Sequence, residues 1–296
     1  MTSAPFCQAP DSTVRVPRVR LPEGATDCHA HICGPVEIFP YWGERIYTPP
    51  DALMPSYKAM LGGLGVSRGV IVQPSVYADD NHAMLVALAS DPKNLRGVAV
   101  VKSTISDSEL VAMNEAGVRG VRCNIVDLTS AKGELPVHEL RALADRIAPF
   151  KWHLELLMHV NEFPQLQSQL ADLPVDLVFG HYGYAPTGVG IQDAGFQALL
   201  ALMKRGKAWV KFTGPYRISS RPVDQPPMYE DVKPFARALI DCNPSRIVWG
   251  TDWPHVMVKG AMPNDADLCD LLGDWVLDSE LREKILVHNP AVLYGF

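Results

Sequence analysis

Histidines and one carboxylate stand at the ends of three separate apolar runs of this sequence. His29 and His31 end the first run, His181 ends the sixth, and Asp252 ends the eighth. Because alternate side chains of a strand point to the same side, His29 and His31 face one space. Such a group suits either of two chemistries: it ligates a metal that activates water, or the histidines polarise a carbonyl while the carboxylate acts as general base.

Each of these residues also has an ordinary structural explanation when it is taken alone. The paired histidines can be packed in a core, and His181 can be a structural residue. Asp252 can be the N-cap of a following helix. Their shared position at strand ends is therefore what predicts a common site.

Eight short apolar runs alternate with stretches of helical period, and this alternation predicts the fold. Continuous runs rich in Val and Ile are typical of strands that are covered on both faces. The alternation favours an α/β fold, a (β/α)8 TIM barrel. The strand-like runs are residues 25–32, 68–76, 95–101, 118–125, 152–160, 175–182, 208–213 and 246–252. The helical stretches are residues 81–90, 107–115, 136–147, 196–204, 230–240 and 279–286.

A doubly wound open sheet is the competing fold. It normally has a Gly-rich phosphate-binding turn after its first strand, and here that turn reads CHAHICGP. In a closed barrel the first and eighth strands are neighbours, so His29, His31 and Asp252 should meet at the C-terminal mouth. We assign residues 25–296 to the barrel. Residues 1–24 contain four prolines and no period, which indicates an N-terminal arm that is either laid on the barrel or disordered.

The composition is that of a folded globular protein and argues against several classes of partner. The 296 residues are 47% hydrophobic and 20% charged, which excludes a disordered chain. The net charge of −6, without a Lys/Arg run, argues against nucleic-acid and anionic-membrane partners. No apolar stretch approaches the roughly 20 residues of a membrane span. The N-terminus lacks the apolar segment of a secretory signal and the six cysteines form no CxxC pair, so we expect a cytoplasmic protein with reduced thiols.

The sequence resembles the amidohydrolase superfamily, and within it the branch of lactone hydrolases that act on pyrone dicarboxylates and sulfomuconolactones. The resemblance implies a hydrolase of carboxylic ester bonds that opens a small anionic lactone. It further implies that Asp252 is the general base and that the three histidines hold the lactone carbonyl. The matching segments are DCHAHICGP, IYTPPDA, VIVQPS, RGVRCN, VFGHYG, KFTGPYR, IVWGTDWPH and HNPAVLY, which extend from about residue 22 to residue 296.

The same resemblance implies a set of substrate-binding residues. Tyr47 and Ser75 would contact the substrate, and Arg122 and Arg217 would bind its carboxylates. The family has two further arginines, where this chain has Leu128 and Tyr184. Because an arginine–carboxylate contact is bidentate and charge-assisted, we expect a substrate with one acidic group rather than two. Tyr184, and His255 from the eighth run's TDWPH, are expected to border this substrate.

The cofactor and the reaction type stay open between alternatives. His29, His31, His181 and Asp252, with His159 of the fifth run as a further candidate, could hold one zinc ion with an open position for water. The resemblance favours catalysis without an obligate metal. A lactone isomerase, or a metal-dependent decarboxylase or hydratase, would use the same residues. A non-catalytic barrel would not need a base beside paired histidines, and a homo-oligomer is compatible with the sequence.

Two charged residues inside apolar runs, and one loop, have more than one explanation. Glu155 in the fifth run needs a partner, supplied either by a function or by a buried ion pair. Lys211 in the seventh run either faces an anion or extends to solvent. The Pro-rich residues 219–228 are expected to form a loop at the mouth, as part of a lid over the substrate.

Overall fold

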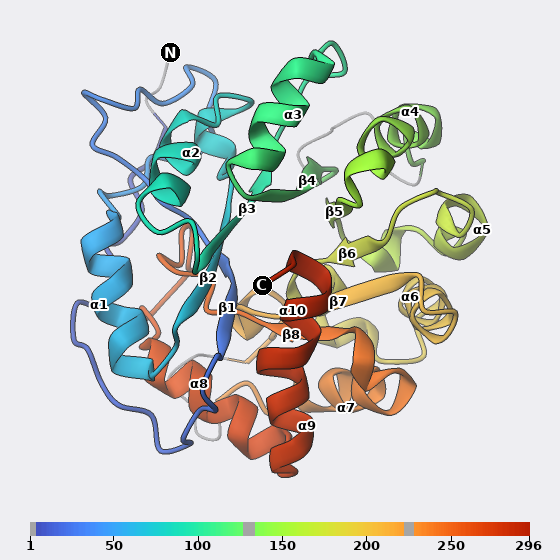
Figure 1. Ribbon diagram of the computed structural model, residues 1–296. Helices are drawn as coiled ribbons and strands as arrows, with labels where there is room; N and C mark the ends of the chain where they lie inside the picture. Colours follow the sequence, from blue (N-terminus) through green and yellow to red (C-terminus); the bar gives the residue numbers. More distant parts are fainter. Residues whose placement is uncertain (1–3, 127–133, 222–227) are drawn as a thin grey trace.

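The computed structural model describes residues 4–126, 134–221 and 228–296 of the chain, and its described residues form a (β/α)8 barrel (Figure 1). Eight parallel strands lie in the order in which they occur along the chain, as the sequence predicts. They are β1 (Thr26–Ala30), β2 (Arg68–Val72), β3 (Leu95–Ala99), β4 (Val118–Asn124), β5 (His153–Leu157), β6 (Leu177–Phe179), β7 (Ala208–Phe212) and β8 (Ile247–Trp249).

The barrel closes between β1 and the segment that follows β8. The N–H of His31 donates to the carbonyl of Trp253 at 2.8 Å, and the N–H of Asp252 donates to the carbonyl of His29 at 2.8 Å. These two hydrogen bonds set the register of the closure. They place the histidine pair directly beside Asp252.

Helices cover the outside of the barrel. Each of the six predicted helical stretches overlaps an observed helix, and four further α-helices of the described residues, α1, α5, α8 and α10, lie outside the predicted stretches. In α1 the pair Gly62-Gly63 weakens the helical signal, and α5 is short. The α8 signal is present, since Asn264 caps the helix and Leu268, Leu271 and Leu272 follow at helical spacing. The helices are α1 (Met54–Leu64), α2 (His82–Ala89), α3 (Asp107–Glu115), α4 (Val137–Ile147), α5 (Leu166–Leu170), α6 (Ala194–Lys204), α7 (Lys233–Cys242), α8 (Asp265–Trp275), α9 (Ser279–Glu283) and α10 (Asn289–Tyr294).

The C-terminal helix α10 covers one end of the barrel. Leu293 and Tyr294 of this helix are buried against apolar side chains inside the ring of strands, and Figure 1 shows the helix in front of that ring. The interior beside them is filled by Cys28, Val70, Val72, Val98, Val178, Trp209 and Val248. Because this end is packed with apolar side chains, a polar site can open only at the other end, where the strands terminate.

The described part of the N-terminal segment, residues 4–24, lies against the barrel in an irregular conformation (Figure 1). The N–H of Cys7 donates to the carbonyl of Thr48 at 2.8 Å. Arg18 forms ion pairs with Asp270 at 3.0 Å and with Asp274 at 3.1 Å, both in α8. None of the helices in the described residues is long and apolar enough to cross a membrane.

Candidate active site

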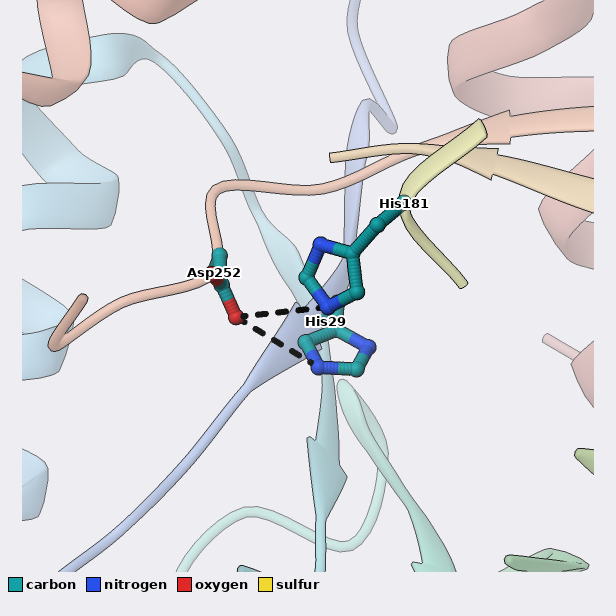
Figure 2. A group of neighbouring side chains, drawn as sticks. All are labelled: His29, His181 and Asp252. Carbon is teal, nitrogen blue, oxygen red and sulfur yellow. Dashed lines mark ion pairs between the residues drawn. The ribbon is translucent and has the colours of Figure 1, made fainter. Parts of the chain in front are cut away.

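The structure brings the histidines and Asp252 together at the C-terminal mouth of the barrel. Figure 2 shows the side chains of His29, His181 and Asp252 converging from the end of β1, the turn after β6 and the segment after β8. His31 lies beside them, with its ring centroid 5.0 Å from that of His29. All four side chains are at most 4% exposed. Their grouping depends on the barrel closure, because they come from segments far apart in the sequence.

The two carboxylate oxygens of Asp252 have different surroundings. Oδ2 accepts hydrogen bonds from the hydroxyl of Tyr216 at 2.7 Å and from Nε of Arg217 at 3.0 Å. Oδ1 faces the histidines, 3.6 Å from Nε2 of His29 and 4.0 Å from Nε2 of His181. Burial raises the pKa of Asp252, but the Arg217 guanidinium and the nearby histidines lower it by more, so its pKa lies well below the usual range. Asp252 is therefore ionised, and its Oδ1 faces the group of histidines.

His31 and His181 are neutral and have the same tautomer. Nδ1 of His31 lies 2.8 Å from the carbonyl oxygen of Val72, and Nδ1 of His181 lies 3.1 Å from that of Thr213. Because a carbonyl only accepts, the ring proton is on Nδ1 and the Nε2 lone pair points into the site. Burial, with a contribution from Arg122, lowers the pKa of His31 to about 4, and burial lowers that of His181 to about 3.

The backbone after β6 and β8 adopts a conformation that is uncommon for residues with side chains. His181 has φ 51° and Asp252 has φ 69°, both in the left-handed region. Gly214 lies between them with φ 52°, and a Cβ there would come within 2.9 Å of Oδ2 of Asp252 and 3.0 Å of Nδ1 of His181. This strained, closely packed backbone directs the side chains of His181 and Asp252 into the mouth.

Asp27 holds the ends of β1 and β8 together and was not predicted as part of the site. Its carboxylate accepts hydrogen bonds from the N–H of Thr251 at 2.9 Å, the Thr251 hydroxyl at 2.7 Å, the N–H of His29 at 3.1 Å and the Tyr57 hydroxyl at 3.0 Å. Burial raises its pKa to about 6, although these hydrogen bonds oppose the shift. The signal in the sequence is a carboxylate inside an apolar run, which requires partners when buried.

A buried ion pair lies directly below His29. Nζ of Lys211 on β7 is 2.6 Å from Oε2 of Glu155 on β5 and 3.2 Å from Nδ1 of His29. The Lys211 side chain is 0% exposed and that of Glu155 2%, so of the two explanations for Glu155 the structure shows the ion pair. Lys211 does not extend to solvent.

A cavity of about 590 Å³ opens above the group and contains most of the residues predicted to bind substrate. Its walls also include Tyr216, which was not predicted, and Lys259. The predicted residues that line it are His31, Tyr47, Ser75, Arg122, His159, His181, Tyr184, Arg217 and Asp252.

Two predicted site residues, His29 and His255, are not among the residues that line the cavity. His29 is below the mouth, and His255 is 0% exposed. Nδ1 of His255 is 2.9 Å from the Tyr216 hydroxyl, and Nε2 is 3.1 Å from Oδ1 of Asp265. The Tyr216 hydroxyl thus lies between His255 and Asp252, so His255 contacts the site through Tyr216 rather than lining the cavity. The signal for Tyr216 in the sequence was its place beside Arg217 in KFTGPYR.

Two further predictions concern residues that the structure does not describe. Leu128, expected to leave one end of the pocket without an arginine, lies outside the described residues. The same is true of residues 222–227, which form most of the loop expected to be a lid.

The spacing of the group suits a metal ion, but the hydrogen bonding of His29 does not. One ligand atom each from His29, His181 and Asp252 lies within 4.8 Å of the others. His159 is apart from this group, since its Nδ1 is 2.9 Å from the carbonyl oxygen of Tyr184. A histidine that binds a metal donates its other N–H to an acceptor, whereas Nδ1 of His29 is approached by the Lys211 ammonium, a donor. With Lys211 donating to Nδ1 of His29, the group of His29, His181 and Asp252 does not fit a metal ion bound through His29.

A closed (β/α)8 barrel with histidines after β1 and β6 and an aspartate after β8 defines a barrel hydrolase of the amidohydrolase type. Residues 26–296 match the family model described as Amidohydrolase, and the chain belongs to this family.

Proteins of known activity and known structure resemble the chain over most of its length. It is 39% identical to "2-pyrone-4,6-dicarbaxylate hydrolase" of Comamonas testosteroni, over 94% of this chain and 92% of that protein. It is 34% identical to 4-sulfomuconolactone hydrolase of Hydrogenophaga intermedia (99% and 95%) and 30% identical to D-galactarolactone isomerase of Agrobacterium fabrum (94% and 93%). The crystal structure of a probable 2-pyrone-4,6-dicarboxylic acid hydrolase from Acinetobacter baumannii, with citric acid bound, has a TM-score of 0.80 at 28% identity, covering 92% of this chain and 100% of that one.

Proposed function

We propose that this protein hydrolyses a small anionic lactone by attack of water, with Asp252 as the general base. The observation that supports this most strongly is the asymmetry of the Asp252 carboxylate. Tyr216 and Arg217 hold Oδ2, while Oδ1 faces neutral histidines at the base of the cavity. An ionised, firmly oriented carboxylate beside a cavity can accept a proton from water that attacks a carbonyl carbon.

The reaction begins when water is held between Asp252 and the lactone carbonyl. The water oxygen bonds to the carbonyl carbon as its proton passes to Oδ1 of Asp252, and negative charge develops on the carbonyl oxygen. The ring C–O bond then breaks, and the leaving oxygen takes the proton back from Asp252. The product is an open-chain acid, and Asp252 is regenerated.

The tautomers of His31 and His181 restrict their part in this reaction. Each presents an Nε2 lone pair, so each can accept a hydrogen bond from the water but cannot donate to a carbonyl oxygen. We therefore assign to these two histidines the orientation of the attacking water. A donor to the carbonyl oxygen must come from another group.

Arg122 is the residue best placed to bind an acidic group of the substrate. It lines the cavity, one of its terminal nitrogens donates to the carbonyl of Gln73 at 3.2 Å, and its Nε has no hydrogen-bond partner among the described residues. Arg217 is already paired with Asp252. Among the described residues that line the cavity, Arg122 is the arginine that is not paired with a carboxylate, which supports a lactone with one carboxylate or sulfonate. The two hydrolases are also named for acidic lactones, although the substrate named for the first is a dicarboxylate.

The test is a panel of lactones matched in ring size, with and without an acidic group, assayed in the presence and absence of a chelator. We expect ring opening of an anionic lactone that survives the chelator, with incorporation of one oxygen atom from ¹⁸O-labelled water. Loss of all activity with the chelator would contradict the metal-free mechanism. Conversion to an isomeric lactone without ¹⁸O would instead support the isomerase alternative, which the relative from Agrobacterium fabrum favours.

A further inference from the structure

We propose that Lys211 and Glu155 are positioning residues that keep the ring proton of His29 on Nε2, which makes His29 a hydrogen-bond donor to the reacting carbonyl and a poor ligand for zinc. The first consequence rests on the proposed lactone hydrolysis. The second concerns the free protein and does not depend on the substrate.

The contacts of Lys211 determine which nitrogen of His29 accepts. An ammonium group has three donors and no acceptor, so the 3.2 Å contact between Nζ of Lys211 and Nδ1 of His29 can be a hydrogen bond only if Nδ1 offers its lone pair. Nζ also contacts Oε2 of Glu155 at 2.6 Å and lies 5.9 Å from the ring centroid of Tyr294. The ammonium is thus held between three groups inside the barrel. With Nδ1 accepting, the proton of neutral His29 is on Nε2.

His29 therefore differs from the two histidines beside it. His31 and His181 donate from Nδ1 to backbone carbonyls and present Nε2 lone pairs, whereas Nε2 of His29 presents an N–H. This nitrogen is buried, has no hydrogen-bond partner in the part of the chain that the structure describes, and is 3.6 Å from Oδ1 of Asp252. His181 and Asp252, which lie beside this nitrogen, both line the cavity. A buried donor without a partner at this position is a group that a carbonyl oxygen can satisfy as its negative charge develops.

Glu155 would favour the other tautomer of His29 if the Lys211 ammonium were removed. Its Oε1 is 3.6 Å from Nδ1 of His29. Without Lys211, the buried carboxylate would draw the His29 proton to Nδ1 and leave a lone pair on Nε2. That is the carboxylate–histidine arrangement found at metal sites, in which the carboxylate increases the basicity of the ligating nitrogen. Lys211 thus selects between a donor and a metal ligand at the same position.

The experiment compares the wild type with Lys211→Met, which removes the ammonium but keeps an unbranched chain. The double variant Lys211→Met/Glu155→Gln removes both charges, and the side-chain amide that Glu155→Gln introduces can again donate to Nδ1 of His29. Lys102→Met, at an exposed lysine, is the surface control. The His29 tautomer is measured by NMR of ¹⁵N-histidine-labelled protein, with the signal assigned from a His29→Asn sample. Zinc affinity is measured by competition with a chromophoric chelator, without any lactone.

We expect the wild type to show His29 protonated on Nε2 and Lys211→Met to show it protonated on Nδ1. Zinc affinity should rise at least about tenfold in Lys211→Met, within the range by which such outer partners alter metal sites. It should fall back in the double variant and stay unchanged in Lys102→Met. A wild-type His29 protonated on Nδ1 would overturn the proposal, as would a folded Lys211→Met protein with unchanged tautomer and zinc affinity. If Lys211→Met does not fold, the wild-type tautomer alone decides.

Discussion

A terminal nitrogen of Arg217 lies 2.9 Å from Oδ2 of Asp252, so the arginine that the resemblance assigns to the substrate is paired with the proposed general base. While the pair persists, Asp252 stays ionised but is a weaker base than an ordinary carboxylate. An acidic group on the substrate that attracts Arg217 would loosen this pair and raise the pKa of Asp252. Substrate charge and the strength of the base are therefore coupled through one residue.

Asp252→Asn should preserve the fold and substrate binding but lower kcat by about two orders of magnitude or more, the scale of a positioned base. The amide oxygen can still accept from Tyr216 and Arg217, so the loss reports the missing proton acceptor. The measurement is kcat and KM for the anionic lactone. Asp265→Asn is the matched control: this carboxylate contacts His255 rather than the cavity, and its variant should lose much less. A wild-type kcat in Asp252→Asn would contradict the role of Asp252 as general base.

Arg122→Met should raise KM for an anionic lactone by about ten- to a hundredfold, equivalent to the roughly 1.5–3 kcal/mol of a charged hydrogen bond. A neutral lactone of the same ring size should be affected much less. The readout is kcat/KM for the matched pair of substrates. An equal penalty for both would show that Arg122 has a structural role only.

Arg217→Met should also raise KM steeply for the anionic lactone, but it should change the pH profile as well. Removing the guanidinium raises the pKa of Asp252, and a base must be deprotonated to act, so activity on the acid side should be lost at a higher pH than in the wild type. Profiles of kcat/KM against pH for Arg217→Met and Arg122→Met separate the two roles. If neither profile moves, the Arg217–Asp252 pair does not tune the base.

The histidines should act as one unit, so their losses should not multiply. We expect His29→Ala and the double variant His29→Ala/His31→Ala to be about equally inactive, because either loss disrupts the arrangement around Asp252. A double-mutant cycle on kcat/KM measures this, with apo and zinc-loaded protein compared. Independent effects that multiply would show that the two histidines serve separate steps.

Acid should destabilise the fold steeply between about pH 6.5 and pH 4. Burial lowers the pKa of four histidines from the usual 6.5: to about 4 for His31, to about 3 for His153 and His181, and well below 6.5 for His29. Below pH 6.5 the unfolded chain therefore binds protons that the folded chain does not, so the free energy of unfolding decreases as the pH is lowered. Asp27 acts in the opposite direction, because its pKa is raised from 3.8 to about 6.

With four histidines acting in one direction and one aspartate in the other, the unfolded chain binds about three more protons than the folded chain in this pH range. The free energy of unfolding should therefore fall by on the order of 4 kcal/mol for each unit by which the pH is lowered. Urea unfolding at pH 7, 6, 5 and 4.5 measures this slope. His82→Gln, at an exposed histidine, should leave the slope unchanged. A flat stability between pH 7 and pH 5 would show that the buried histidines are already protonated in the folded protein.

The sequence by itself determined the barrel and the candidate catalytic group. Each strand is a continuous apolar run, which can be recognised in the sequence without knowing which strands lie beside it. His29, His31, His181 and Asp252 were recognisable because each stands where a run ends, and in a barrel all such ends share one face. The sequence also contains a signal for α8, the cap residue Asn264 followed by Leu268, Leu271 and Leu272, but the boundaries of helices are specified less clearly than those of the apolar strands.

Only the tertiary structure decided what these side chains contact. Lys211 and Glu155 are 56 positions apart on β7 and β5, and nothing local distinguishes a lysine that reaches solvent from one enclosed between a carboxylate and His29. The same holds for the pairing of Arg217 with Asp252 and for Tyr216 standing in front of His255. The reason is physical: strand period sets which face a side chain takes, whereas its partner, tautomer and pKa depend on groups from other strands that only barrel closure brings within hydrogen-bond distance.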